Sequence, residues 1–270
     1  MRDVRGFTLT ELAVVLAIVA FLLGGLMYTL SAQTDQRNFE ETRRRLDQAR
    51  ELILTFAAVN GRLPCPARSA ATATPSTVAG DEVRTAGSDP ECIGDGVVDN
   101  YGGTSGATVL GLLPARTIGY QQVDASGFAV DAWGNRIRYA VARLVTACSG
   151  TSTLPHFTNA TNLKANGISC QPNDLLVCKS ATGVTATTCG GAANQVMSQS
   201  LVVAVVYSTG KNGANGSAGT DETENIDGDR VFVYHTPTPS TAANGEFDDQ
   251  FTWITVGELY GRMIAAGVLP

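Results

Sequence analysis

The sequence FTLTELAVVLAIVAFLLGGLMYTL, residues 7–30, forms a long apolar run near the N-terminus. Residues 12–30 carry no charge, and as a helix rising ~1.5 Å per residue they nearly cross a ~30 Å hydrocarbon core. Arg2 and Arg5 precede the run, so the positive-inside rule predicts a cytoplasmic N-terminus and a single membrane span. A cleaved secretory signal peptide is the alternative, but its apolar region is usually shorter, and residues 31–33, SAQ, make a poor cleavage site.

Glu11 is the one charged residue between positions 6 and 34. A carboxylate within an apolar helix is costly, at roughly 2.5–3.5 kcal/mol near the bilayer centre and less toward the interface. It either lies at the level of the lipid headgroups or pairs with a positive group of another subunit. A newly exposed α-amino group would be such a partner, and the residues alone leave both interpretations open.

The segment GFTLTEL, residues 6–12, follows a short basic leader and opens the apolar run. In these features the N-terminus resembles the prepilin signal of type IV pilins and type II secretion pseudopilins. The resemblance implies that a prepilin peptidase cleaves between Gly6 and Phe7 and that the new Phe7 amine is methylated. It also implies that Glu11 neutralises the amine of a neighbouring subunit. The implied partners are other pilin or pseudopilin subunits and an inner-membrane assembly platform.

The N-terminal helix is expected to continue beyond the apolar run, because residues 33–59 contain neither proline nor glycine. Apolar residues recur at helical spacing along one face, and charged residues fill the other faces. The apolar stripe consists of Phe39, Leu46, Ala49, Ile53 and Phe56. Asn60-Gly61 is a typical C-terminal stop. We therefore predict one helix over residues 7–59 whose second half packs its stripe on a sheet.

A turn followed by a strand is predicted from residues 130–139, VDAWGNRIRY. Gly134-Asn135 is a turn signal, and the apolar residues that follow it alternate as in a strand. The stretch resembles the turn-plus-strand motif of the major pseudopilins, which favours a pseudopilin over a pilus subunit. The alternative is a hairpin anchored by Trp133 that serves folding alone.

The chain has 270 residues, 44% of them hydrophobic, which predicts either one large domain or one domain with an appendage. Further strands are predicted at 201–207, 230–235 and 251–256, with a closing helix at 257–269 and an insertion at 148–195. The predicted fold class is α+β and pilin-like: a long N-terminal helix, transmembrane and then amphipathic, packs on an antiparallel β-sheet with loop-rich, disulfide-tied insertions. The predicted divisions are a leader (1–6), a transmembrane half-helix (7–32), an amphipathic half-helix (33–60) and a periplasmic or extracellular head (61–270).

Six cysteines lie beyond the apolar run, and none forms a Cys-x-x-Cys pair. Zinc-ribbon and thioredoxin-type sites are therefore disfavoured. The charge rule places these cysteines outside the cytoplasm, where disulfides are favoured. Six cysteines allow 15 connectivities. Pairing neighbours in sequence would give Cys65–Cys92, Cys148–Cys170 and Cys178–Cys189.

Acidic residues gather in the C-terminal third of the chain. They are Asp221, Glu222, Glu224, Asp227, Asp229, Asp248 and Asp249. Carboxylates clustered in loops suit Ca²⁺, and major pseudopilins hold calcium in a loop near the C-terminus, but the EF-hand spacing is absent. We expect a solvated acidic loop and no cofactor, with calcium as the open alternative and any metal ligands unknown.

Neither nucleic-acid binding nor catalysis is expected. The net charge of −6 disfavours a nucleic-acid partner. The sequence lacks a nucleophile elbow, a phosphate-binding loop and a zinc-protease motif. Of the two histidines, His156 is predicted on a surface loop and His235 at the end of a strand.

The sequence thus predicts a structural subunit of a type IV pilin-like filament, specifically a type II secretion pseudopilin. It would be a single-pass protein of the bacterial inner membrane with a periplasmic head. A subunit of a surface type IV pilus for adhesion, motility or DNA uptake is the first alternative. An uncleaved, membrane-anchored periplasmic binding domain is the second.

Overall fold

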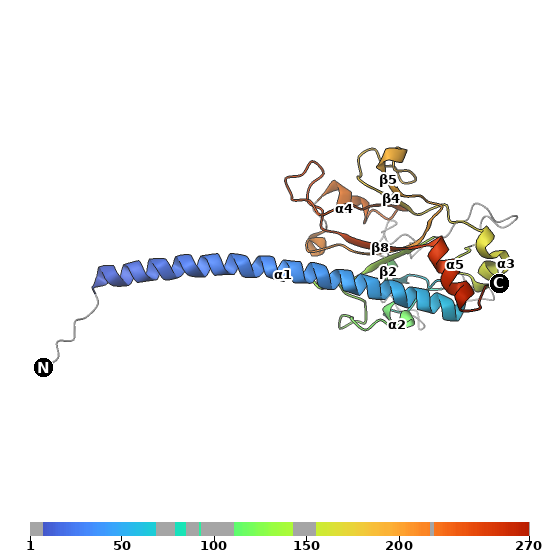
Figure 1. Cartoon of the computed structure of the whole chain (residues 1–270), viewed down its shortest axis with the longest axis horizontal. Coiled ribbons are helices and arrows are strands. Elements are labelled where there is room, and N and C mark those ends of the chain that lie inside the picture. Colours follow the sequence, from blue (N-terminus) through green and yellow to red (C-terminus); the bar gives the residue numbers. More distant parts are fainter. Residues whose placement is uncertain are drawn as a thin grey trace. The chain divides into compact units, whose positions relative to one another are not determined.

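The computed structural model describes residues 8–68, 79–84, 92, 111–142, 155–216 and 219–269, without the side chains of residues 23–32 and 215. The chain divides into two compact units, residues 1–41 and 42–270. Helix α1, Leu9–Asn60, contributes to both units (Figure 1). The helix predicted from the absence of proline and glycine is therefore continuous and ends at the expected Asn60-Gly61 stop.

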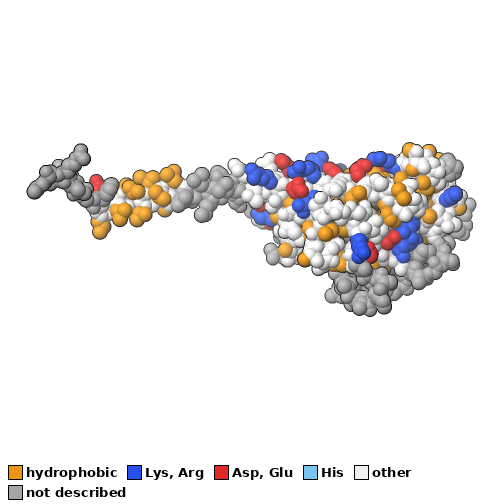
Figure 2. All heavy atoms as spheres, turned by 90° about the horizontal axis from the view of Figure 1, so that it is seen from below, with side chains coloured by type: hydrophobic (Ala, Val, Ile, Leu, Met, Phe, Trp, Pro, Cys, Tyr) orange, Lys and Arg blue, Asp and Glu red, His pale blue; other side chains and the backbone are white. Residues whose placement is uncertain are grey.

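The N-terminal part of α1 exposes apolar side chains (Figure 2). They are Leu9, Leu12, Val14, Val15, Leu16, Ile18, Val19, Phe21 and Leu22. No helix within the described residues is both long and apolar enough to cross a membrane, so the span expected over residues 7–32 is not confirmed.

A five-stranded sheet forms the centre of the second unit, and every neighbouring pair in it is antiparallel. Its strands, in spatial order, are β1 (Ala67–Arg68), β2 (Gly111–Leu112), β3 (Arg138–Val141), β6 (Val202–Ser208) and β8 (Gln250–Thr255). The central strand β6 is buried along its whole length, as its continuous apolar sequence predicts. The predicted α+β class with an N-terminal helix on an antiparallel sheet is confirmed.

A second, three-stranded sheet lies on the side of β8 away from α1 (Figure 1). It contains β5 (Gln195–Met197), β4 (Leu176–Cys178) and β7 (Val231–Val233) in that order. β4 and β7 pair in parallel, so not all strand pairs of the head are antiparallel. The strand predicted at 230–235 joins this sheet because the inserted segment provides β4 as its partner.

Short helices complete the described part of the head. They are α2 (Ala115–Ile118), α3 (Ala160–Asn166), α4 (Thr220–Glu224) and α5 (Val256–Ala265), with 3-10 turns at Gly167–Ser169, Ala192–Asn194 and Gly213–Asn215. α5 begins where Thr255 accepts a hydrogen bond from the Glu258 N–H at 3.3 Å, which is a side-chain N-cap. The Arg50 guanidinium of α1 donates to the Glu258 carboxylate at 2.6 Å, so α5 is tied to α1.

The core lies between α1 and the central sheet. From α1, Leu46, Ala49 and Ile53 are fully buried in one cluster with residues of β3, β6 and β8, as the predicted stripe requires. Phe56, also in that stripe, is only partly buried, and Ala57 takes part in its place. The stripe therefore rotates slightly around the helix toward its C-terminal end, as expected of a 3.6-residue period.

The turn at residues 131–135 joins α1, β3 and β6 through the buried Asp131. One oxygen of Asp131 accepts from the N–H groups of Trp133 and Asn135 at 2.9 and 2.8 Å, and the other accepts from the Ser208 hydroxyl at 2.6 Å. Gly134 has φ +89°, which favours glycine at this point of the turn. The Asn135 amide donates to the Gly210 carbonyl at 2.6 Å and fixes the chain beyond β6.

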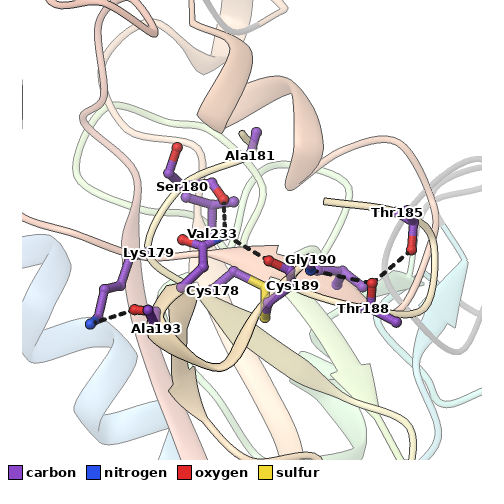
Figure 3. Close-up of a disulfide and its surroundings, with 12 residues drawn as sticks. Cys178, Lys179, Ser180, Ala181, Thr185, Thr188, Cys189, Gly190, Ala193 and Val233 are labelled. Atoms are coloured by element: carbon purple, nitrogen blue, oxygen red, sulfur yellow. Dashed lines mark hydrogen bonds between the residues drawn. A yellow bond between two sulfur atoms is a disulfide. The ribbon is translucent and has the colours of Figure 1, made fainter. Parts of the chain in front are cut away.

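Two disulfides follow the sequence-local pairing, Cys65–Cys92 and Cys178–Cys189. Cys170 is also disulfide-bonded, and its predicted partner Cys148 lies outside the described residues. The Cys178–Cys189 bond closes a loop beside β4 and β7 (Figure 3). It staples a segment with few core residues of its own, which is the role expected of such a bond.

Replacing Ile53 with alanine tests how far the head depends on α1. Ile53 is fully buried, so the Ile53→Ala substitution should lower the free energy of unfolding by about 2–5 kcal/mol. Val59 is 77% exposed on the same helix, so Val59→Ala should change it by less than about 0.5 kcal/mol. Urea unfolding followed by circular dichroism measures both, and equal effects would contradict the packing described.

Candidate functional site

The residues of the prepilin-like signal lie at the start of α1. Gly6 and Phe7 lie outside the described residues. Thr8 and Glu11 bond reciprocally: the Thr8 hydroxyl accepts from the Glu11 N–H at 3.3 Å, and the Thr8 N–H donates to the Glu11 carboxylate at 2.9 Å. This is a capping box, which satisfies two backbone groups of the first helical turn. Glu11 is exposed and lies close in sequence to the amine that cleavage after Gly6 would create.

Three acidic residues meet inside the head, which the sequence did not predict. Glu222 comes from α4, and Asp248 and Asp249 directly precede β8. Their exposed fractions are 0%, 5% and 2%, and each offers a carboxylate oxygen within 4.8 Å of the others. The expectation of a solvated acidic loop is wrong for these three residues, because α4 and the segment before β8 fold onto the end of the sheet.

Hydrogen bonds from the loop after β6, from the C-terminal end of α4 and from the segment before β8 hold these carboxylates. The Glu222 carboxylate accepts from the Asn212 amide at 2.9 Å and from the Asp248 N–H at 2.8 Å. Asp248 Oδ2 accepts from the Lys211 N–H at 3.1 Å, and Asp249 Oδ2 accepts from the Asn225 amide at 2.8 Å. Each side chain is thus oriented by a neighbouring donor.

Three oxygens at this site are buried and have no hydrogen-bond partner in the described part of the chain: Asn212 Oδ1, Asp248 Oδ1 and Asp249 Oδ1. An unpartnered buried acceptor costs about 1–3 kcal/mol, and more where the group is charged. Gly210, at φ +63°, lies so close to Asp248 that any side chain there would collide with its carboxylate. The chain is thus closely packed around acceptors that lack donors.

The carboxylates at this site carry like charges and repel one another. Burial, and then the nearby Glu222 charge, raise the pKa of Asp248 to about 7. Burial also raises the pKa of Asp249 well above its usual range. Like charges in a buried site disfavour ionisation, and an oxygen-only donor set is the kind that a hard divalent cation such as Ca²⁺ prefers. Glu222, Asp248 and Asp249 would therefore be the ligands of a calcium ion at this site.

A second acidic group, Glu224, Asp227 and Asp229, lies nearer the surface. Its aspartates act in turns: Asp227 accepts from the Asp229 N–H at 3.0 Å, and Asp229 accepts from the Val231 N–H at 2.7 Å. Burial, and then the Asp227 and Asp229 charges, raise the pKa of Glu224 to about 7. These local bonds explain the aspartates without a ligand, so this group is the partly solvated acidic loop that the sequence predicts.

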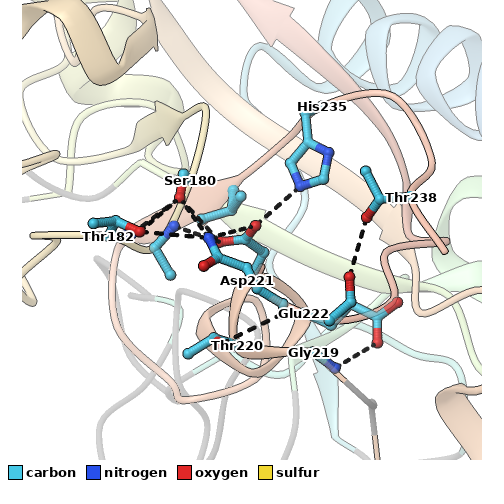
Figure 4. Close-up of polar contacts among 12 residues, drawn as sticks. Ser180, Thr182, Gly219, Thr220, Asp221, Glu222, His235 and Thr238 are labelled. Atoms are coloured by element: carbon cyan, nitrogen blue, oxygen red, sulfur yellow. Dashed lines mark hydrogen bonds and ion pairs between the residues drawn. The ribbon is translucent and has the colours of Figure 1, made fainter. Parts of the chain in front are cut away.

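Asp221 is buried between a loop and a histidine (Figure 4). Its carboxylate accepts from the Ala181 N–H at 2.6 Å and faces His235 Nε2 at 3.1 Å. Ser180 contacts Asp221 rather than the imidazole, whereas a hydrolase triad needs the imidazole in the middle. His235 lies two residues beyond the end of β7, close to its predicted place.

His156 is buried, so its predicted place on a surface loop is wrong. The Tyr260 hydroxyl donates to the Cys170 carbonyl at 2.6 Å, so His156 Nε2 donates to that hydroxyl, at 3.2 Å. His156 Nδ1 has no partner within the described ranges, as suits a neutral ring. Burial lowers the pKa of His156 to about 4. The loop is drawn inward because the neighbouring Phe157 enters the core.

Acid should destabilise the head partly through His156. Its pKa in the folded protein, about 4, lies below the ordinary value of 6.5, so its contribution is complete above pH 6.5 and is lost as the pH falls through 4. His156→Gln keeps an N–H donor without the titration, and should flatten the fall in unfolding free energy over this window by up to ~3 kcal/mol. Urea unfolding between pH 7.5 and 4 measures it; identical slopes would exclude the assignment.

Comparison with known proteins identifies a motif at the N-terminus. Residues 1–27 match the family model described as the prokaryotic N-terminal methylation motif. This motif is the prepilin-type cleavage and methylation signal of type IV pilin-like proteins, so the chain carries the signal of that class of filament subunit. The search of curated proteins found no match, and the search of solved structures found none either. The match confirms the resemblance drawn from residues 6–12.

Proposed function

We propose that this protein is a structural subunit of a type IV pilin-like filament, specifically a type II secretion pseudopilin. One observation supports the class above all: the methylation motif leads directly into α1, whose C-terminal part is the core helix of an α+β head. The proposal includes cleavage after Gly6 by a prepilin peptidase, methylation of Phe7, an inner-membrane span at residues 7–32 before assembly, and a periplasmic head.

In this proposal Glu11 directs assembly. Before assembly its carboxylate bonds Thr8, as the capping box requires. During assembly the apolar side chains of the first turns pack against those of other subunits, and an unpaired carboxylate among them would be costly. The amine of a neighbouring subunit's Phe7 offsets that cost and fixes the stagger between subunits, because only one register brings the two charges together.

A pseudopilin is preferred to a surface pilin on the evidence of the head. The turn at residues 131–135 resembles that of the major pseudopilins, and it holds the Gly210 carbonyl close to the acidic site. Deleting the gene separates the alternatives: a pseudopilin mutant loses secretion of exoproteins, whereas a pilin mutant loses filaments that can be sheared from the surface. A native protein that still begins at Met1 would instead indicate a tethered periplasmic domain.

Glu11→Leu should leave membrane insertion intact and prevent incorporation into filaments, because the pairing charge is lost. Glu40→Leu is the matched control, an exposed carboxylate on the same helix whose loss should leave filaments unchanged. Crosslinking of subunits in membranes, followed by immunoblotting, measures incorporation. Intact-mass measurement of the same samples checks cleavage after Gly6.

Normal filaments from Glu11→Leu would contradict the proposed role of Glu11. Equal loss from both variants would show that any change to a helix carboxylate disturbs assembly, and would also contradict it. Cleavage at Gly6 should occur in both variants, since the substitutions lie outside the scissile bond.

We also propose that the head binds calcium at Glu222, Asp248 and Asp249. The three buried carboxylates and the unpartnered oxygens Asn212 Oδ1, Asp248 Oδ1 and Asp249 Oδ1 support this. Bound calcium would supply positive charge to these oxygens and would join α4 to the segment before β8. Binding to the folded state alone stabilises a protein, by about 2.7 kcal/mol at a ligand concentration 100 times Kd.

In the presence of chelator, Asp248→Asn should have a higher melting temperature than the native chain. Calcium should raise the melting temperature of the native chain but not that of Asp248→Asn. The asparagine amide removes one of the mutually repelling carboxylates, but it also removes a proposed calcium ligand. Asp227→Asn, at the exposed acidic group, should retain the full calcium effect. Thermal unfolding with EDTA or with calcium measures both, and an unchanged calcium effect in Asp248→Asn would refute the site.

A further inference from the structure

Helix α4 carries two adjacent buried acids that point into different surroundings. Glu222 faces the acidic site described above, whereas Asp221 faces the loop after β4 and His235 (Figure 4). Adjacent residues of a helix diverge by ~100°, so one short helix can join two sites in this way. A five-residue helix is not stable by itself, and its position depends on the contacts of its side chains.

Asp221 is the main polar anchor of α4. Its carboxylate accepts from the Ala181 N–H at 2.6 Å and from the Asn244 amide at 3.0 and 3.1 Å, and Ser180 approaches at 3.4 Å. The Asn244 amide also donates to the Ser180 hydroxyl at 2.7 Å. These bonds join α4 to two segments, the loop after β4 and the chain that leads to Asp248.

The loop that holds Asp221 is itself fixed. The Cys178–Cys189 disulfide closes it (Figure 3). The Asn194 amide donates to the carbonyls of Ser180 and Cys189 at 2.8 and 3.0 Å. A closed loop has few conformations to lose, so it can orient Asp221 at little entropic cost.

The His235 ring lies against the Asp221 carboxylate. Its Nδ1 lies 2.7 Å from the Thr236 carbonyl and its Nε2 lies 3.1 Å from the Asp221 carboxylate. The Phe247 ring stacks on the His235 ring at 3.9 Å. The buried Asp221 thus contacts the His235 ring as well as the donors of Ala181 and Asn244.

The backbone beside Asp221 leaves little room for α4 to shift. A side chain at Gly219 would collide with the carbonyls of Asn244 and Glu246, so α4 begins in direct contact with that segment. The Thr220 N–H donates to the Asn244 carbonyl at 2.8 Å. A displaced Asp221 would therefore displace Glu222 together with the chain before Asp248.

We propose that Asp221 is a positioning residue through which the disulfide-closed loop Cys178–Cys189 holds Glu222 in the calcium site. This inference rests on the proposed calcium binding and names what sets its affinity. Asp221 does not contact the ion. It fixes α4, and the loop and His235 fix Asp221.

The test measures calcium affinity of the full-length chain in detergent by titration calorimetry. Asp221→Ala should raise the Kd for calcium at least tenfold, and Asp221→Asn should raise it less, because an amide oxygen still accepts from Ala181. Replacing Cys178 and Cys189 with serine should raise it at least tenfold as well. When Asp221→Ala is already present, replacing Cys178 and Cys189 with serine should raise the Kd little further, because both changes release the same helix.

The other described disulfide provides the matched control. Replacing Cys65 and Cys92 with serine should lower the melting temperature but leave the calcium Kd unchanged, because no described contact joins that bond to α4. Circular dichroism confirms that each variant is folded. If the Cys178 and Cys189 variant does not fold, the comparison of Asp221→Ala with Asp221→Asn still tests the proposal.

The outcomes separate the two proposals. If the native chain does not bind calcium, the calcium site itself is wrong. If the native chain binds calcium and Asp221→Ala binds it with the same Kd, the site stands and the positioning role is overturned. The positioning role is also overturned if the Cys65 and Cys92 variant loses as much calcium affinity as the Cys178 and Cys189 variant. It is likewise overturned if the fold-changes in Kd of Asp221→Ala and of the Cys178 and Cys189 variant multiply in the combined variant.

Discussion

The burial of one face of α1 against the antiparallel sheet is the interaction on which the rest of the head depends. A sheet must cover its apolar face, and Leu46, Ala49 and Ile53 provide the cover over β3, β6 and β8. The edge strand β8 is held in the same way, since Arg50 of α1 donates to the Trp253 carbonyl at 3.0 Å.

The partners of each buried carboxylate indicate its role, because a polar group that is shielded from solvent needs a partner within the protein. The turn at Asp131, the cluster of Glu222, Asp248 and Asp249, and the Asp221–His235 pair all place carboxylates out of solvent. Asp131 is satisfied by donors from its own turn and from Ser208. Asp221 accepts from the loop after β4 and contacts the His235 ring. Asp248 and Asp249 each retain an unpartnered oxygen in the described structure, and this difference from Asp131 and Asp221 supports the proposed calcium site.

The elements that were predicted well are those with a local signal. The strands β6 and β8 and helix α5 lie within a residue or two of their predicted starts, because unbroken or alternating apolar residues define them. Their partners were less predictable. β7 was expected as a strand, but its parallel pairing with β4 depends on the insertion. His156 and the buried acids were misplaced because polarity predicts exposure only until another segment covers the residue.

The sequence by itself determined the N-terminal signal, the continuous α1 and the α+β class, because a cleavage motif and a helical period are properties of neighbouring residues. Only the tertiary structure decided that Glu222 meets Asp248 and Asp249, and that Asp221 meets His235 and the Cys178–Cys189 loop. These groups are far apart in the chain, and their contact depends on how two sheets and α4 pack. Local sequence patterns do not predict that packing, because the interactions that stabilise it form between segments that come together only on folding.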